Sequence, residues 1–300
     1  MSKLSTMLLL AALAGCDAGN YSNEDIDFQL AVPAREDIAV RLPTQALEAN
    51  DAPEFYRTTR ATVRDLDSSA DAFISLLDHV RVAAPSERMD NRRIWGPFPI
   101  EESPLWLARL VVQRTAVTPL HFAYSIEFRA KADETASWNP LFRGEFTPGP
   151  NARHGVGSLE FTATVARAAG YPLGNLAKID HLLIDYKTDA FPLRVTIEVT
   201  DVADKASRYE HTEEQDGSGA MVFTFPTDGS VVTSLEIRSR WLGSGAGRAD
   251  VKVLTGVPLA VGLTGTDCWG IDTRPTYVHR GWEPNRADVG MESDCVFRAP

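Results

Sequence analysis

The chain has 300 residues, a formal net charge of −11 and 44% hydrophobic residues. That apolar content is ordinary for a globular protein, and the length suffices for one large β domain or two small ones. The acidic charge and the lack of a basic cluster argue against a nucleic-acid partner, because binding to phosphates depends on lysine and arginine.

The first fifteen residues have the layout of a secretory signal peptide. One basic residue, Lys3, precedes a short apolar run over residues 7–13, and small residues follow. The run is far shorter than the ~20 residues needed to span a bilayer. It ends in Leu13-Ala14-Gly15-Cys16, which resembles a bacterial lipobox. The resemblance implies removal of residues 1–15, attachment of diacylglycerol to the Cys16 thiol, and acylation of the new amino group, with palmitate as a typical chain.

Such an anchor predicts an exported protein attached by lipid to the bacterial cell envelope. Each buried CH₂ group contributes about 0.8 kcal/mol, so two or more acyl chains hold durably. Without Lys3 the formal charge becomes −12, and an acidic body should avoid anionic lipid. The membrane partner is therefore expected to be reached through the lipid anchor. An ordinary secretory signal with a chance cysteine is the alternative, and the choice of membrane and face stays open.

The segment after the signal is polar and acidic. We interpret residues 16–27 as the lipidated cysteine and a flexible tether, and residues 28–300 as a single β-rich domain. Two short apolar pieces open that domain, at 28–32 and 38–42, and each alternates with polar residues and is followed by a proline. Because proline removes a ladder donor, both pieces are predicted to be edge strands.

Residues 54–82 carry the strongest helical pattern of the chain. Apolar or small residues recur at alternating spacings of four and three: Thr59, Val63, Leu66, Ala70, Phe73, Leu77 and Val80. This periodicity predicts one long amphipathic helix, bracketed by Pro53 and Pro85. A helix packed on a sheet is favoured over a lid or a partner-binding helix.

From residue 94 onward the apolar period changes from 3.6 to 2. Apolar segments separated by Gly-, Pro- and Asp-containing turns lie at 105–115, 122–128, 159–165, 179–186, 195–199, 221–225, 235–237 and 251–253. Short strands with tight turns predict an antiparallel meander, and its apolar face needs the early helix as a cover. The predicted fold class is α+β, mostly β: an antiparallel sheet meander, open or closed and barrel-like, packed by one long N-terminal helix.

The three cysteines divide into one and a pair. With Cys16 assigned to lipid, Cys268 and Cys295 remain, and in an exported protein such a pair predicts a disulfide. Closing a loop of about 28 residues would stabilise the fold by roughly 3 kcal/mol. A redox or metal pair is the alternative, although the spacing is not Cys-x-x-Cys.

Six short segments taken together suggest a family. They are Val32-Pro33 with Val40 and Pro43, residues 55–60, Trp95-Gly96-Pro97, residues 155–159, residues 245–250, and Asp267-Cys268-Trp269. They resemble a group of uncharacterised bacterial lipoproteins of the myxobacterial type. The resemblance spans most of the mature chain and implies no activity and no catalytic residues. A signal, a helix and a meander are also similar in architecture to lipoprotein carriers with an open β-barrel, but architecture does not establish function.

Motifs for catalysis or for a cofactor are not found in the sequence. The glycine-rich residues 243–247 precede a strand rather than a helix, so a hairpin is favoured over a phosphate loop. No Gly-x-Ser-x-Gly motif occurs, and the six histidines lack metal-ligand spacing. We therefore predict no cofactor, no metal and no catalytic residues.

Two groups of acidic residues leave alternatives open. The C-terminal carboxylates Asp267, Asp272, Asp288, Glu292 and Asp294 are interpreted as solvated loops, with a calcium site as the alternative. Four carboxylates in or beside strands could form a glycosidase pair if two shared one face: Glu127, Glu145, Glu160 and Glu198.

Aromatic residues bracket the proline-rich segment at 95–99. Trp95, Phe98 and Trp106 are a possible binding surface, with packing in the core or its rim as the alternative. The predicted function is that of a non-enzymatic cell-envelope lipoprotein that binds a ligand or protein partner, such as an apolar molecule on the concave sheet face or another envelope protein. An envelope-polymer hydrolase is the alternative, and a purely structural surface component is a third.

Overall fold

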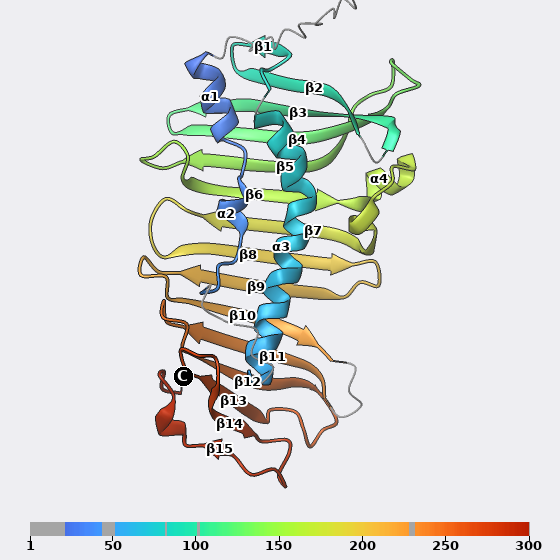
Figure 1. Ribbon diagram of the computed structural model, residues 1–300. Coiled ribbons are helices and arrows are strands. Elements are labelled where there is room, and N and C mark those ends of the chain that lie inside the picture. The colour runs from blue at the N-terminus through green and yellow to red at the C-terminus, as the bar shows by residue number, and fades with distance from the viewer. Residues whose placement is uncertain (1–21, 44–51, 82, 101–102, 228–231, 300) are drawn as a thin grey trace, which may run out of the picture.

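The computed structural model describes residues 22–43, 52–81, 83–100, 103–227 and 232–299. Its central element is one antiparallel sheet of fifteen strands, in which each strand pairs with its neighbours in sequence (Figure 1). The sheet does not close, so β1 and β15 are its two edges. The predicted α+β class with an antiparallel meander is confirmed, and of the open and closed forms the open one is present.

The strands vary from two to fifteen residues in length. Their bounds are β1 Glu87–Met89, β2 Arg92–Ile100, β3 Ser103–Val117, β4 Leu120–Ala130, β5 Asn139–Pro148, β6 Gly155–Thr162, β7 Ile179–Lys187, β8 Leu193–Asp201, β9 Ala206–Glu213, β10 Gly219–Pro226, β11 Val232–Trp241, β12 Gly247–Gly256, β13 Thr264–Trp269, β14 Pro275–Arg280 and β15 Val289–Gly290.

Alternating residues give the sheet one apolar face. Successive side chains of a strand point to opposite sides, so the register must align the apolar positions of neighbouring strands. One such row crosses five strands from β4 to β8 as Ile126, Phe142, Phe161, Leu182 and Val199. The first four of these side chains are buried. Hydrophobic burial on this single face therefore selects the register.

Two glycines admit tyrosine rings on this apolar face. A Cβ atom at Gly144 would lie 2.2 Å from Cζ of Tyr124, and one at Gly157 would lie 2.3 Å from the hydroxyl oxygen of Tyr186. The Tyr124 ring can consequently cross β5 and donate a hydrogen bond of 2.7 Å to the carbonyl oxygen of Ser158 on β6. Larger residues at the two glycines would displace the rings.

Helices cover the apolar face in two passes (Figure 1). The first pass holds α1 (Asn23–Leu30), which contacts β3, and α2 (Arg35–Ile38), which contacts β7. The second pass is α3 (Glu54–Arg81), which starts against β11, β12 and β13. Beyond the end of α3, the carbonyl oxygen of Ala83 accepts a hydrogen bond from the Trp95 indole on β2, at 3.0 Å. The chain therefore crosses most of the sheet twice.

The helical prediction for residues 54–82 is confirmed by α3, although the side chains of Ala70, Phe73 and Val80 lie outside the described set. The two edge strands predicted at 28–32 and 38–42 are wrong. Residues 28–30 end α1, Ile38 ends α2, and no strand includes residues 39–43. A short apolar alternation also suits a chain that lies across an apolar face, and here that packing prevails over strand pairing.

The segment interpreted as a flexible tether is shorter than expected. Residues 23–27 belong to α1, which begins with a capping box between Ser22 and Asp25. Asp25 is fully buried, and Phe28 packs edge-on against Phe122 with ring centroids 5.3 Å apart. Residues 22–27 thus form the beginning of a helix that packs against the sheet. The rest of the predicted tether lies outside the described residues.

Buried carboxylates attach the helical layer to the sheet at three places. Asp25 of α1 pairs with Arg93 at 2.7 Å, and Asp37 of α2 pairs with Arg153. Asp267 of β13 accepts the backbone N–H of Phe55 at the start of α3, at 2.8 Å. Burial alone raises the pKa of Asp25, but hydrogen bonds from Arg93 and Ser22 outweigh burial and lower it to about 2. Breaking such a buried pair is costly because one charge is left uncompensated.

The disulfide between Cys268 and Cys295 is present, as predicted. Cys268 lies on β13 with its side chain fully buried. The bond holds residues 291–299, which we call the tail, against β11 and β12. There Arg240 donates to the carbonyl oxygen of Arg298 at 2.8 Å, and Arg248 pairs with Glu292 at 2.9 Å.

Candidate functional site

The sheet face opposite the helices, here the open face, is polar. The residues that alternate with the apolar row point to this side. One row of cross-strand neighbours from β3 to β9 is Gln113, Ala123, Glu145, Ser158, Asp185, Thr196 and Glu210. Short hydroxyl and methyl side chains therefore alternate with carboxylates along the middle of the sheet.

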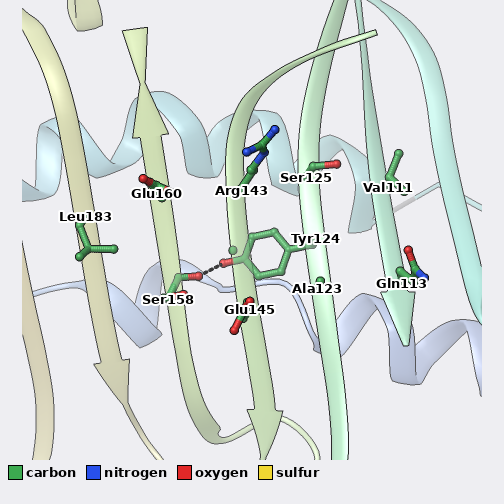
Figure 2. A pocket seen from close by; sticks show the side chains of 11 residues that line it. Val111, Gln113, Ala123, Tyr124, Ser125, Arg143, Glu145, Ser158, Glu160 and Leu183 are labelled. Carbon is green, nitrogen blue, oxygen red and sulfur yellow. Dashed lines mark hydrogen bonds between the residues drawn. The ribbon is translucent and has the colours of Figure 1, made fainter. Parts of the chain in front are cut away.

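A hollow of about 360 Å³ lies on the open face over β3 to β7. Figure 2 shows small residues on both sides of the central strand β5, with Ala123 and Ser125 on β4 and Ser158 on β6. Longer side chains, Arg143 and Glu160 among them, stand around these residues. The hollow lies where small side chains on β4 and β6 flank the longer Arg143 and Glu145 of β5. We call it the first hollow.

The charged side chains of the first hollow differ in whether they have an ion-pair partner among the described residues. Glu145 lies 3.6 Å from Nε2 of His121, and Glu160 lies 3.1 Å from Nε2 of His181. Arg143 is exposed and has no ion pair or hydrogen bond within the described part of the chain. An incoming carboxylate or carbonyl oxygen would therefore find an unoccupied guanidinium in this hollow.

The face beside the first hollow is acidic. Asp185 on β7 is the cross-strand neighbour of Ser158. Burial raises the pKa of Asp185, the nearby Glu198 carboxylate raises it further, and the Arg208 guanidinium opposes both effects. Glu198 is itself paired with Arg208. The carboxylates of Asp185 and Glu198 and the guanidinium of Arg208 therefore form a charge network on the solvent-exposed side of the sheet.

A second hollow of about 550 Å³ lies on the same face near the other end of the sheet. It is lined by residues of β11 to β14 and by Glu292 and Ala299 of the tail. Ion pairs in and beside this hollow join Glu236 with Arg238 at 2.7 Å and Asp250 with Arg240 at 3.2 Å. The tail thus forms one wall of this hollow.

The aromatic residues predicted as a binding surface do not assemble into one. Trp95 is fully buried and lies in the apolar core. Phe98 is half-buried against that core, and Trp106 packs edge-on against Phe128 and Tyr171, at centroid distances of 5.5 and 5.4 Å. Core packing, the alternative reading, therefore describes these residues, because β2 and β3 turn their aromatic side chains toward the helical layer. Cys16 lies outside the described residues.

The four strand carboxylates all reach the open face, each beside a cation or a histidine. Glu127 pairs with Arg109 at 2.7 Å, and Glu145 and Glu160 both line the first hollow. The C-terminal carboxylates are dispersed: Asp267 is buried against Arg280, and Asp288 pairs with His279 at 2.9 Å. Among the residues described, no three His, Cys, Asp or Glu side chains are grouped so that they could hold a metal ion.

Sequence reasoning missed Arg143 and the small residues of the first hollow. Ala123, Ser125 and Ser158 are unremarkable in sequence, and only the pairing of β4 with β5 and β6 brings them together. The alternation within β4, β5 and β6 is the signal that could have found them, because it puts these residues on the face opposite Phe122, Phe142 and Phe161.

Comparison with protein-family models, with curated proteins and with solved structures finds no match. Within the described ranges, no helix is both long enough and apolar enough to cross a bilayer.

Proposed function

We propose that this protein is a non-enzymatic lipoprotein of the bacterial cell envelope that binds a protein partner on the open face of its sheet. The Leu13-Ala14-Gly15-Cys16 motif supports the lipid anchor. The paired cysteines 268 and 295 fit an oxidising compartment, where disulfides persist.

The binding role rests on one observation, which is the structural difference between the two faces of the sheet. The apolar face is covered by helices for most of its length, whereas the open face has two hollows of several hundred Å³. The open face is polar along its rows of cross-strand neighbours. It offers an extended array of hydrogen-bonding groups and charges to a partner, and such arrays set the specificity of association.

A polar protein surface fits this face better than an apolar ligand. The apolar side of the sheet is filled by side chains such as Phe28, Phe122 and Phe161, which are almost completely buried. A gap beside Tyr56 and Trp269, under the start of α3, has a volume of only about 10 Å³, roughly the space of one water molecule. An acyl chain needs far more room than this gap provides.

The anchor is tested by metabolic labelling with an alkyne analogue of palmitate. The wild-type chain is expected to incorporate label, and the Cys16→Ser variant is expected to lose it and to keep its signal peptide. An unlabelled wild-type chain, processed like an ordinary secreted protein, would refute the anchor.

The open face is tested with a photoreactive benzoylphenylalanine at Ser158, in the first hollow, or at Arg57, which is exposed on α3. We expect an adduct of one defined mass from Ser158 in intact cells and none from Arg57. Reversing a charge on the partner-facing side, Arg143→Glu, should weaken that adduct, and the matched reversal Arg57→Glu should not. Equal adducts from both positions, or indifference to Arg143→Glu, would count against the proposal.

A further inference from the structure

The start of α1 is clamped rigidly to one corner of the sheet. Glu24 reaches Arg114 of β3 at 2.7 Å and Arg93 of β2 at 2.9 Å. Asp25 pairs with the same Arg93 at 2.7 Å and with Arg88 of β1 at 3.0 Å. Two of these four ion pairs involve the fully buried Asp25, so the first turn of α1 moves with the sheet.

Arg114 also attaches the turn between β1 and β2 to this corner. The Arg114 side chain donates to the carbonyl oxygen of Asp90 at 2.7 Å, and its backbone N–H donates to that of Asn91 at 2.8 Å. The turn between β1 and β2 therefore lies against α1 and β3. The β3–β4 turn begins three residues beyond Arg114, on the same side of the sheet as α1 (Figure 1). We call residues 22–26, 87–91 and 117–120 the anchor corner.

Apolar side chains protrude from the anchor corner. Ile26 of α1, Met89 of β1 and Val117 of β3 are all exposed, and Val117 retains 75% of its accessible surface. They stand among charged and polar residues, including Arg88 and Asp90. A few apolar side chains within a polar rim suit the headgroup region of a bilayer, where an apolar group can insert while its neighbours stay hydrated.

The reach of the chain limits which surface can approach a membrane. If Cys16 carries the lipid, six residues separate it from Asn23, and an extended chain spans at most about 25 Å over that distance. Fifteen strands spaced by about 4.8 Å extend about 65 Å from β1 to β15. The short tether therefore holds the β1 end of the sheet close to the lipid headgroups.

We infer that the anchor corner is the surface through which this protein contacts the bilayer, with Ile26, Met89 and Val117 inserted at the headgroup level. The inference rests on the proposed lipid anchor and adds the orientation of the body. The β15 end and the second hollow then project away from the membrane. The open face away from the anchor corner stays accessible to a partner, because the contact uses only one corner of the sheet.

Fluorescence quenching in vesicles tests the orientation. The full-length lipidated protein is reconstituted into phosphatidylcholine vesicles with or without doxyl-labelled lipid, with one NBD fluorophore on a cysteine introduced as Val117→Cys, Met89→Cys or Ile271→Cys. Ile271 is the matched control, since it is an apolar turn residue with 64% exposure beyond β13, near the opposite end of the sheet. Doxyl lipid should reduce emission at positions 117 and 89 by about twofold or more and leave position 271 unchanged.

Flotation of the same vesicles separates the two hypotheses. Protein that floats with the vesicles but is quenched equally at all three positions, or only at position 271, overturns the orientation and leaves the anchor intact. Protein that does not float overturns both. A chain with twenty Gly and Ser residues inserted after Ala18 should still float, and quenching at position 117 should fall toward that of the control. Undiminished quenching in this variant would contradict the role given to the short tether.

Discussion

The buried histidine of β9 should make the stability of the fold depend on pH. His211 is only 4% exposed and stacks on Trp241 with ring centroids 5.8 Å apart. Its Nδ1 lies 3.2 Å from the carbonyl oxygen of Ala220, and its Nε2 has no hydrogen-bond partner in the described structure. Burial lowers the pKa of His211 from 6.5 to about 4, the Ala220 carbonyl opposes this, and the charge of Arg41 adds to it. The neutral ring is thus favoured in the folded state.

The sign of the effect follows from proton binding in the two states. Between pH 6.5 and about 4, the unfolded chain binds a proton at His211 and the folded chain does not. The stability contributed by the neutral ring is therefore complete above pH 6.5 and is lost progressively as the pH falls toward 4. A pKa change of this size corresponds to about 3 kcal/mol.

Urea unfolding of the oxidised protein at several pH values between 7.5 and 4.5 measures this effect. His211→Phe keeps a ring against Trp241 and removes the titrating group. The free energy of unfolding of wild type relative to this variant should fall by about 1.4 kcal/mol per pH unit below pH 6. His181→Phe, at an exposed position of the open face, should leave most of the wild-type slope in place. Parallel pH profiles of wild type and His211→Phe would refute the argument.

Three further substitutions test the packing and the attachments of the sheet. Replacing both cysteines of the disulfide by serine should lower the free energy of unfolding by roughly 3 kcal/mol in urea, since the unfolded chain gains freedom. Gly144→Ala should cost about 1–3 kcal/mol in the same assay, because the added Cβ displaces the ring of Tyr124, and an unchanged midpoint would show that the ring has room. Asp25→Asn should cost about 3 kcal/mol, because it leaves Arg93 buried with its charge only partly compensated. The Asp25 contribution, present above its ordinary pKa of 3.8, should disappear as the pH falls toward 2, as acid unfolding of the variant and wild type would reveal.

The long helix and the meander could be predicted because the sequence patterns that indicate them are local. A stripe at spacings of three and four can only form one face of a helix, and β4 alternates so regularly that its buried residues follow directly from Phe122, Tyr124, Ile126 and Phe128. The disulfide followed from counting cysteines in a chain that its N-terminal sequence predicts to be exported, which requires no knowledge of the fold. These predictions depend on periodicity and composition alone.

The path of the first pass, which holds α1 and α2, could not be predicted from local patterns. Residues 28–32 and 38–42 show an alternation that suits a strand, yet Asp25 and Asp37 find arginines on β2 and in the β5–β6 connection and hold the segment across the apolar face. The partner of a buried carboxylate lies far away in sequence. No local pattern distinguishes a strand from a chain that packs across strands.

The class of fold, the long helix and the cysteine pairing could be predicted from the sequence alone, because each depends on neighbouring residues or on composition. The tertiary structure was needed to show that the sheet stays open, that Trp95 is core and not surface, and that Arg143 lines a hollow without an ion pair or hydrogen bond among the described residues. These features depend on the register between strands, which is chosen by the burial of the apolar face as a whole. The open face is the outcome of that choice, and it is where the proposed partner would bind.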